Sequence, residues 1–227
     1  AYVNSSKGVD LHTGRLIPVD EKTPHVGMVA RDICPASPGA KDFQPTAFSP
    51  RTGLLYIPHN NLCMDYEGVE ANYIAGTPYV GANVKMYAGP GGNRGQFTAW
   101  DPVAQKAVWN IDEMFPAWGG ALVTAGDVVF YGTMDGWFKA VDARTGKELW
   151  KQKVSSGIIA PPISYRGPDG KQYIAVVAGV GGWSGGIVAG DIDVRDSTAA
   201  LGFANAMKTL PQYTTKGGEL YIFGLSQ

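Results

Sequence analysis

An eleven-residue pattern that occurs twice constrains the fold of this chain more than any other feature. Residues 99–109 read AWDPVAQKAVW and residues 140–150 read AVDARTGKELW, so Ala, Asp, Lys and Trp recur at matching positions 41 residues apart. Related turns occur at Thr13-Gly14 and Thr52-Gly53, and the four turns are separated by 39, 52 and 41 residues. A period in this range indicates repeated supersecondary units, with one interval enlarged by an insertion.

The chemistry of the repeat indicates a tight hairpin that ends in a large ring. In the second copy, Asp142 can accept hydrogen bonds from turn amides, and Gly146 can supply the positive φ that the turn needs. Trp150 then stands at a fixed distance from the turn, where its ring can dock one sheet on the next and bury on the order of 200 Å². The sheets would be the blades of a β-propeller, and the alternative is two similar hairpins in an ordinary sandwich.

Composition and strand signals agree with an all-β protein. The chain has 31 Gly and 15 Pro among 227 residues and only 17% charged residues, which is typical of many turns between short apolar segments. The segments that we expect to be strands are rich in β-branched or aromatic residues, and they are 53–58, 96–100, 127–131, 137–141, 173–178 and 219–223. A net charge of −1 gives no basic surface for nucleic acid, and no apolar run is long enough to span a membrane.

The repeat period also predicts how the chain is organised. At about 41 residues per blade, residues 1–227 would hold about four blades and represent the C-terminal half of a longer propeller. We expect an inserted loop around 62–95 and a short helical excursion around 197–210. The two cysteines, Cys34 and Cys63, fit either two buried thiols or one disulfide.

Several longer motifs resemble the quinoprotein alcohol dehydrogenases. They are the two Trp-docking repeats, the segment from WGGALV to KELW at 118–150, SSGIIAPPISY at 155–165 and AGVGGWSGG at 178–186. The segment from DICPA to CMDYE at 32–67 is similar to the methanol dehydrogenase large subunit. The resemblance covers essentially the whole chain but only about the last two-fifths of such a subunit. It implies part of an eight-bladed propeller that carries pyrroloquinoline quinone (PQQ).

The resemblance implies three cofactor-binding residues. Trp118 matches the family tryptophan whose ring forms the floor beneath the quinone, although it could instead be another docking ring. Trp183 matches a position beside the cofactor, with a structural turn as the alternative reading. Asp42 matches a position that is typically Asn in calcium enzymes and Asp in the lanthanide-dependent branch, and a loop aspartate that caps a turn is its alternative.

The resemblance also decides between the readings of the cysteines. The family pairs a cysteine of the DICPA segment with one of the CMDYE segment, which implies a disulfide between Cys34 and Cys63. Such a crosslink implies an oxidising compartment, the periplasm. Two buried thiols in a cytosolic protein are the alternative.

The implied activity is the oxidation of methanol or another small primary alcohol. In the family, an Asp base takes the hydroxyl proton, hydride passes to the quinone, a bound lanthanide or calcium ion acts as Lewis acid, and electrons leave to cytochrome c. The base and the metal ligands lie upstream in the family, so we expect no catalytic or metal-binding residue in this chain and no activity without the N-terminal remainder of the subunit. A homodimer of the full subunit is also expected.

Two other functions compete with this one. A noncatalytic Trp-docked propeller scaffold of the outer-membrane assembly type would share the repeats, and a calcium-dependent quinoprotein ethanol dehydrogenase would share the cofactor. The three histidines, His12, His25 and His59, lie far apart in sequence without a metal-binding spacing, so we expect them to be structural.

Overall fold

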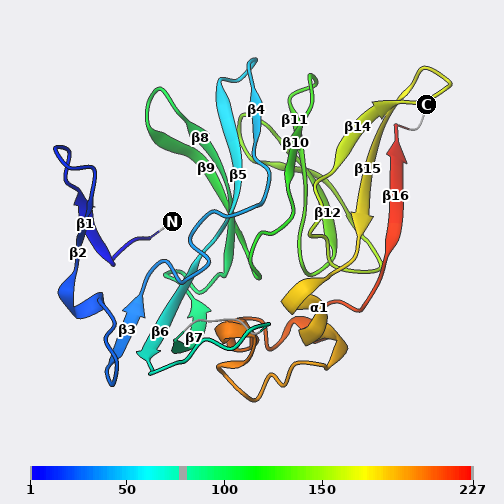
Figure 1. The fold of residues 1–227 in the computed structure, drawn as a ribbon. Helices are drawn as coiled ribbons and strands as arrows, with labels where there is room; N and C mark the ends of the chain where they lie inside the picture. The colour runs from blue at the N-terminus through cyan, green and yellow to red at the C-terminus, as the bar shows by residue number, and fades with distance from the viewer. Residues whose placement is uncertain (1, 77–80, 226–227) are drawn as a thin grey trace.

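The computed structural model describes residues 2–76 and 81–225. In this part of the chain the strands form five sheets, and all neighbouring strands are antiparallel. Figure 1 shows three of these sheets fanned side by side, with the smaller β3-β6-β7 sheet and the helices gathered at one end of the fan. The expected all-β architecture is confirmed.

Two sheets have four strands in the order of a meander. One consists of β4 (Ala47–Ser49), β5 (Leu54–Asn60), β8 (Gly95–Asp101) and β9 (Lys106–Glu113). The other consists of β10 (Ala121–Val123), β11 (Val128–Gly132), β12 (Trp137–Asp142) and β13 (Glu148–Lys153). Each sheet presents apolar residues to the other, which is the packing expected of adjacent propeller blades.

Two further sheets are smaller than these. Three strands pair as β14 (Ile163–Arg166), β15 (Gln172–Ala178) and β16 (Glu219–Gly224), and the first hairpin pairs β1 (Ser6–Val9) with β2 (Leu16–Pro18). The division of residues 1–227 into about four blades stays a prediction.

The segment expected to be a loop at 62–95 contains two paired strands. The chain leaves β5, forms β6 (Leu62–Gly68) and β7 (Ala82–Ala88), and returns at β8, which pairs directly with β5. β6 also pairs with β3 (Val29–Ile33), which completes a separate three-stranded sheet. The strand signal lies in β7, where Val84 and Met86 are buried opposite Tyr66 and Met64 while Lys85 between them is exposed. The Gly-rich composition of the segment hid this alternation.

Between β15 and β16 lies a helical segment. It contains α1 (Gly182–Ala189), the 3₁₀ helix η2 (Ala199–Gly202), α2 (Phe203–Ala206) and the 3₁₀ helix η3 (Leu210–Gln212); a further 3₁₀ turn, η1 (Asp20–Lys22), lies near the first hairpin. The helices η2 and α2 fall where a helical excursion was expected, whereas α1 was not foreseen. Helix α2 packs on β7, where Asn205 Nδ2 donates to the carbonyl of Met86 at 2.6 Å. Within the described residues, no helix is long and apolar enough to cross a bilayer.

The docking role predicted for the repeated tryptophan is confirmed at Trp109. Its indole Nε1 donates to the carbonyl of Ala143 at 3.1 Å, in the β12–β13 turn of the next sheet. Trp150 lies between its own sheet and the next one, with its ring 5.2 Å from that of Phe223 on β16. A cavity of about 540 Å³ lies beside Trp150, so the contact between this sheet and the β14-β15-β16 sheet is less tightly packed than the contact made by Trp109.

Candidate cofactor site

Trp118 lies in the connection between β9 and β10, and its ring is held from three directions. Its side chain is 9% exposed, and Nε1 donates to Asn60 Oδ1 at 3.1 Å. The ring of Phe203 packs against the indole in a T-shaped arrangement at a centroid distance of 5.3 Å, and that of Phe43 does so at 6.2 Å. Trp118 is therefore not a docking tryptophan of the Trp109 type, because its indole N–H bonds to a side chain of the β5 terminus.

The two glycines after Trp118 allow backbones to approach closely. A Cβ at Gly119 would lie 2.6 Å from the carbonyl oxygen of Gly132, and a Cβ at Gly120 would lie 2.6 Å from Pro161 and 3.0 Å from Pro45. These contacts explain the WGG motif by the packing between β10 and its neighbours.

Asp42 lies in the loop 39–45, which is braced by its own side chains. The backbone N–H of Asp42 donates to Gln44 Oε1 at 3.0 Å, and Lys41 Nζ donates to the carbonyls of Asp42, at 2.8 Å, and of Gln44. Gln44 is fully buried, whereas Asp42 is exposed. Burial lowers the pKa of Lys41, and the nearby Asp42 opposes this shift. The loop therefore presents a carboxylate to solvent on a rigid backbone.

Trp183 lies in the first turn of helix α1. Its side chain is 41% exposed, and its ring lies 5.2 Å from that of Phe203 in a tilted arrangement. The preceding Gly182 has a φ of 58°, which favours glycine where the chain enters the helix.

Two phenylalanines connect the three predicted residues. Phe203 contacts both Trp118 and Trp183, and Phe43, which follows Asp42, contacts Trp118. The structure thus brings segments from three distant parts of the sequence into one aromatic cluster. Their assignment to a cofactor stays a prediction at this point.

A disulfide fixes the chain just before the Asp42 loop. Cys34 and Cys63 are bonded, with a Cα–Cα distance of 4.4 Å and a sequence separation of 29 residues. Beside it, the N–H of Ala36 donates to the carbonyl of Leu62 at 2.8 Å. The pairing implied by the resemblance is confirmed, and it joins the end of β3 to β6.

A buried ion pair between the two four-stranded sheets was not expected from the sequence. Lys139 Nζ donates to both carboxylate oxygens of Glu113 at 2.7 and 2.9 Å, and Tyr131 Oη donates to Glu113 Oε1 at 2.7 Å. Burial raises the pKa of Glu113, and Lys139 and Tyr131 oppose that shift. The three residues come from β9, β11 and β12, so no local spacing could have indicated the cluster.

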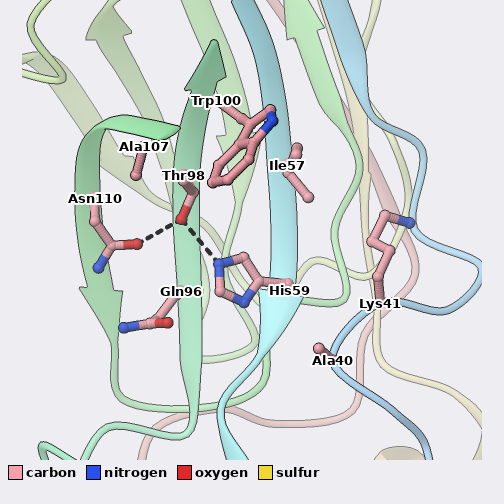
Figure 2. Close-up of a pocket in the computed structure, with 9 residues that line it drawn as sticks. All are labelled: Ala40, Lys41, Ile57, His59, Gln96, Thr98, Trp100, Ala107 and Asn110. Atoms are coloured by element: carbon pink, nitrogen blue, oxygen red, sulfur yellow. Dashed lines mark hydrogen bonds between the residues drawn. The ribbon is translucent and has the colours of Figure 1, made fainter. Parts of the chain in front are cut away.

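A pocket borders the Asp42 loop on the face of β5, β8 and β9 that is turned away from β10–β13 (Figure 2). Its volume is about 320 Å³, and it is lined by Ala40, Lys41, Ile57, His59, Gln96, Thr98, Trp100, Ala107 and Asn110. Thr98 Oγ1 donates to Asn110 Oδ1 at 2.5 Å, so His59 Nε2, at 2.8 Å, donates to Thr98. Burial lowers the pKa of His59, and the carbonyl of Asn60 beside its Nδ1 opposes that shift. Asp42, Trp118 and Trp183 do not line this pocket.

Among residues 2–76 and 81–225, no group of three or more His, Cys, Asp or Glu side chains is arranged to hold a metal ion. The aromatic cluster contains two indoles, and the adjoining loop carries one carboxylate; indoles can pack against a flat ring, and a carboxylate can accept hydrogen bonds from its polar edge.

Comparison with known proteins defines the class of this fold and site. Residues 91–174 match the family described as "Glucose/ethanol/alcohol dehydrogenase, beta-propeller domain", which carries the designation PQQ. The architecture is therefore a β-propeller of the PQQ type, as predicted.

The relatives narrow this class. The chain is 54% identical to a lanthanide-dependent methanol dehydrogenase of Methylacidiphilum fumariolicum, over 99% of this chain and 38% of that protein. It is 41% identical to subunit 1 of the cytochrome c methanol dehydrogenase of Methylobacterium organophilum, over 98% of this chain and 36% of that protein. A solved europium-containing methanol dehydrogenase superposes with a TM-score of 0.94 at 54% identity, over 99% of this chain and 40% of that chain.

The chain belongs to the quinoprotein alcohol dehydrogenases, and over almost its whole length it is similar to a portion of proteins named lanthanide-dependent methanol dehydrogenases. It spans about two-fifths of the length of the relatives it matches.

Proposed function

We propose that this chain is part of a PQQ-dependent dehydrogenase that oxidises methanol or another small primary alcohol. The observation that carries the proposal is the aromatic cluster, in which Trp118 and Trp183 share contacts with Phe203 and the Asp42 loop adjoins Trp118. The relatives that match almost the whole chain are named methanol dehydrogenases, and this supports the proposed substrate.

The residues present fit one wall of a flat cofactor with polar edges. The orientation of Trp118 is fixed by its N–H bond, which suits a floor against which a planar ring can lie. Trp183 is partly exposed and can cover a second portion of the group. The exposed carboxylate of Asp42 can accept hydrogen bonds from cofactor groups and partly balance the charge of a trivalent ion.

PQQ, when bound, supplies the acceptor for the two electrons that the alcohol loses. The residues of this chain bind and orient that group, and they supply negative charge through Asp42. We propose that the proton-accepting base and the metal ligands come from parts of the protein outside this chain.

The remaining features of the proposal follow from the relatives and the disulfide. A lanthanide ion is favoured over calcium because relatives at 54% identity are named lanthanide-dependent and europium-containing. Cytochrome c is the proposed electron acceptor, since related subunits carry its name. The Cys34–Cys63 disulfide supports a periplasmic location. A homodimer of the complete subunit is part of the same proposal.

The test uses the complete protein, purified and supplied with PQQ and either a lanthanide or calcium. We expect the quinone absorption band in the purified complex and methanol-dependent reduction of cytochrome c with the lanthanide. A protein that neither binds PQQ nor oxidises alcohols would overturn the proposal in favour of a noncatalytic scaffold. Turnover of ethanol with calcium but not of methanol with a lanthanide would contradict the metal and substrate assignments.

A further inference from the structure

Asn60 connects the Asp42 loop to the Trp118 indole. It is the last residue of β5 and is only 1% exposed. Its backbone N–H donates to the carbonyl of Ala40 at 2.7 Å, and its Nδ2 donates to the carbonyl of Gly39 at 3.1 Å. Its Oδ1 accepts the indole N–H of Trp118 at 3.1 Å. One side chain therefore bonds to both halves of the proposed cofactor wall.

The chemistry of the partners fixes the orientation of the Asn60 amide. The indole N–H can only donate, so it must face Oδ1, and the Gly39 carbonyl can only accept, so it must face Nδ2. A flipped amide would lose both bonds in a buried place, where an unpaired polar group is costly. The Asn60 amide therefore has one stable orientation, and through its two hydrogen bonds it holds the Trp118 ring in a fixed position relative to the loop.

The other contacts of Trp118 do not fix the ring in this way. Phe43 and Phe203 pack against the indole in T-shaped arrangements, and apolar contacts of this kind have broad geometric preferences. A hydrogen bond from Ala121 to the carbonyl of Pro45, at 3.0 Å, links the loop to the backbone after Trp118 but does not touch the indole.

We infer that Asn60 is a positioning residue, which sets the angle of the Trp118 ring relative to the Asp42 loop and so shapes the proposed PQQ surface. Only the predicted effect on PQQ binding rests on the proposed function. The orientation of the ring can be tested without the cofactor.

The experiment uses the complete protein labelled with 5-fluorotryptophan, in which the ¹⁹F resonance of Trp118 is assigned from its loss in W118F. Asn60→Leu removes both side-chain bonds, whereas Asn60→Asp keeps an acceptor for the indole and loses the donor to Gly39. Asn61→Leu is the matched control, because Asn61 is also buried but its Nδ2 bonds to the 90–93 turn and not to Trp118.

We expect Asn60→Leu to shift the Trp118 resonance in the PQQ-free protein and to weaken PQQ binding by about tenfold. Asn60→Asp should shift the resonance less, and it provides a second variant should Asn60→Leu fail to fold. The control should leave the resonance and the PQQ affinity near their wild-type values. An Asn60 variant that matches the Asn61 control in both measurements overturns the inference. A shifted resonance in a protein whose wild type binds no PQQ supports the positioning role and contradicts the proposed function.

Discussion

The indole Nε1 of Trp109 donates to the carbonyl of Ala143 at 3.1 Å, so a ring from one sheet is bonded to the turn of the next sheet. The same ring lies against Gly146, where an added Cβ would come within 2.8 Å of it. The Trp of the first copy of the repeat therefore packs against the turn glycine of the second copy, and both residues form the junction between successive sheets.

This junction predicts the effect of a methyl group at Gly146. Gly146→Ala should lower the free energy of unfolding through two causes, the positive φ of 72° and the collision with the Trp109 ring. Gly53 has the same φ of 72° in the related turn but no atom within 4 Å of an added Cβ. In urea denaturation we expect a loss of about 1 kcal/mol for Gly53→Ala and about 2–4 kcal/mol for Gly146→Ala. Equal losses would show that the ring contact adds nothing.

The Glu113–Lys139 ion pair predicts a pH-dependent mutation. Lys139→Met leaves a buried carboxylate without its cation and should cost about 3–5 kcal/mol near neutral pH. Burial raises the pKa of Glu113 above its ordinary value of 4.5, and the loss of Lys139 raises it further. The carboxyl is neutral in both folded and unfolded protein well below pH 4.5, so the penalty is small there and grows as pH rises towards and through the raised folded pKa.

The measurement is the free energy of unfolding of Lys139→Met and wild type between pH 4 and pH 8. The double variant Glu113→Gln with Lys139→Met removes the charge and should recover most of the stability without the pH dependence. A penalty that stays constant across this range would contradict the ion-pair explanation.

The disulfide predicts a response to reductant. Because Cys34 and Cys63 are 29 residues apart, their crosslink should contribute about 3–4 kcal/mol by restricting the unfolded chain. Reduction should therefore lower the urea midpoint of the wild-type protein. The variant with both cysteines changed to serine should have the lower urea midpoint with or without reductant. A midpoint equal to that of the oxidised wild-type protein would contradict a stabilising role of the disulfide.

Asp42 predicts a change in metal preference under the proposed function. Asp42→Asn keeps the hydrogen bond from its backbone N–H to Gln44 but removes a negative charge. This loss should weaken the binding of a trivalent ion more than that of a divalent ion. The ratio of alcohol turnover with a lanthanide to turnover with calcium should fall on the order of tenfold, while thermal stability changes little. Asp169→Asn, another exposed aspartate, serves as the control. An unchanged ratio would show that Asp42 does not determine the metal preference.

The sequence by itself determined the blade-forming hairpins and their docking rings. The turn, the positive-φ glycine and the tryptophan all lie within eleven residues, so their geometry follows from local chemistry and repeats wherever the pattern repeats. The resemblance added Cys34 with Cys63, and it named Asp42, Trp118 and Trp183, which the structure brings together around Phe43 and Phe203.

Only the tertiary structure decided the rest, because the partners lie far apart along the chain. Asn60 and Trp118 are 58 residues apart, and Glu113 is 26 residues from Lys139, so no local pattern links them. The β6–β7 hairpin was hidden because its pairing with β3 and its cover by α2 define which alternate residues are buried. Burial and hydrogen-bond partners belong to the packed fold, and they give these residues their structural roles.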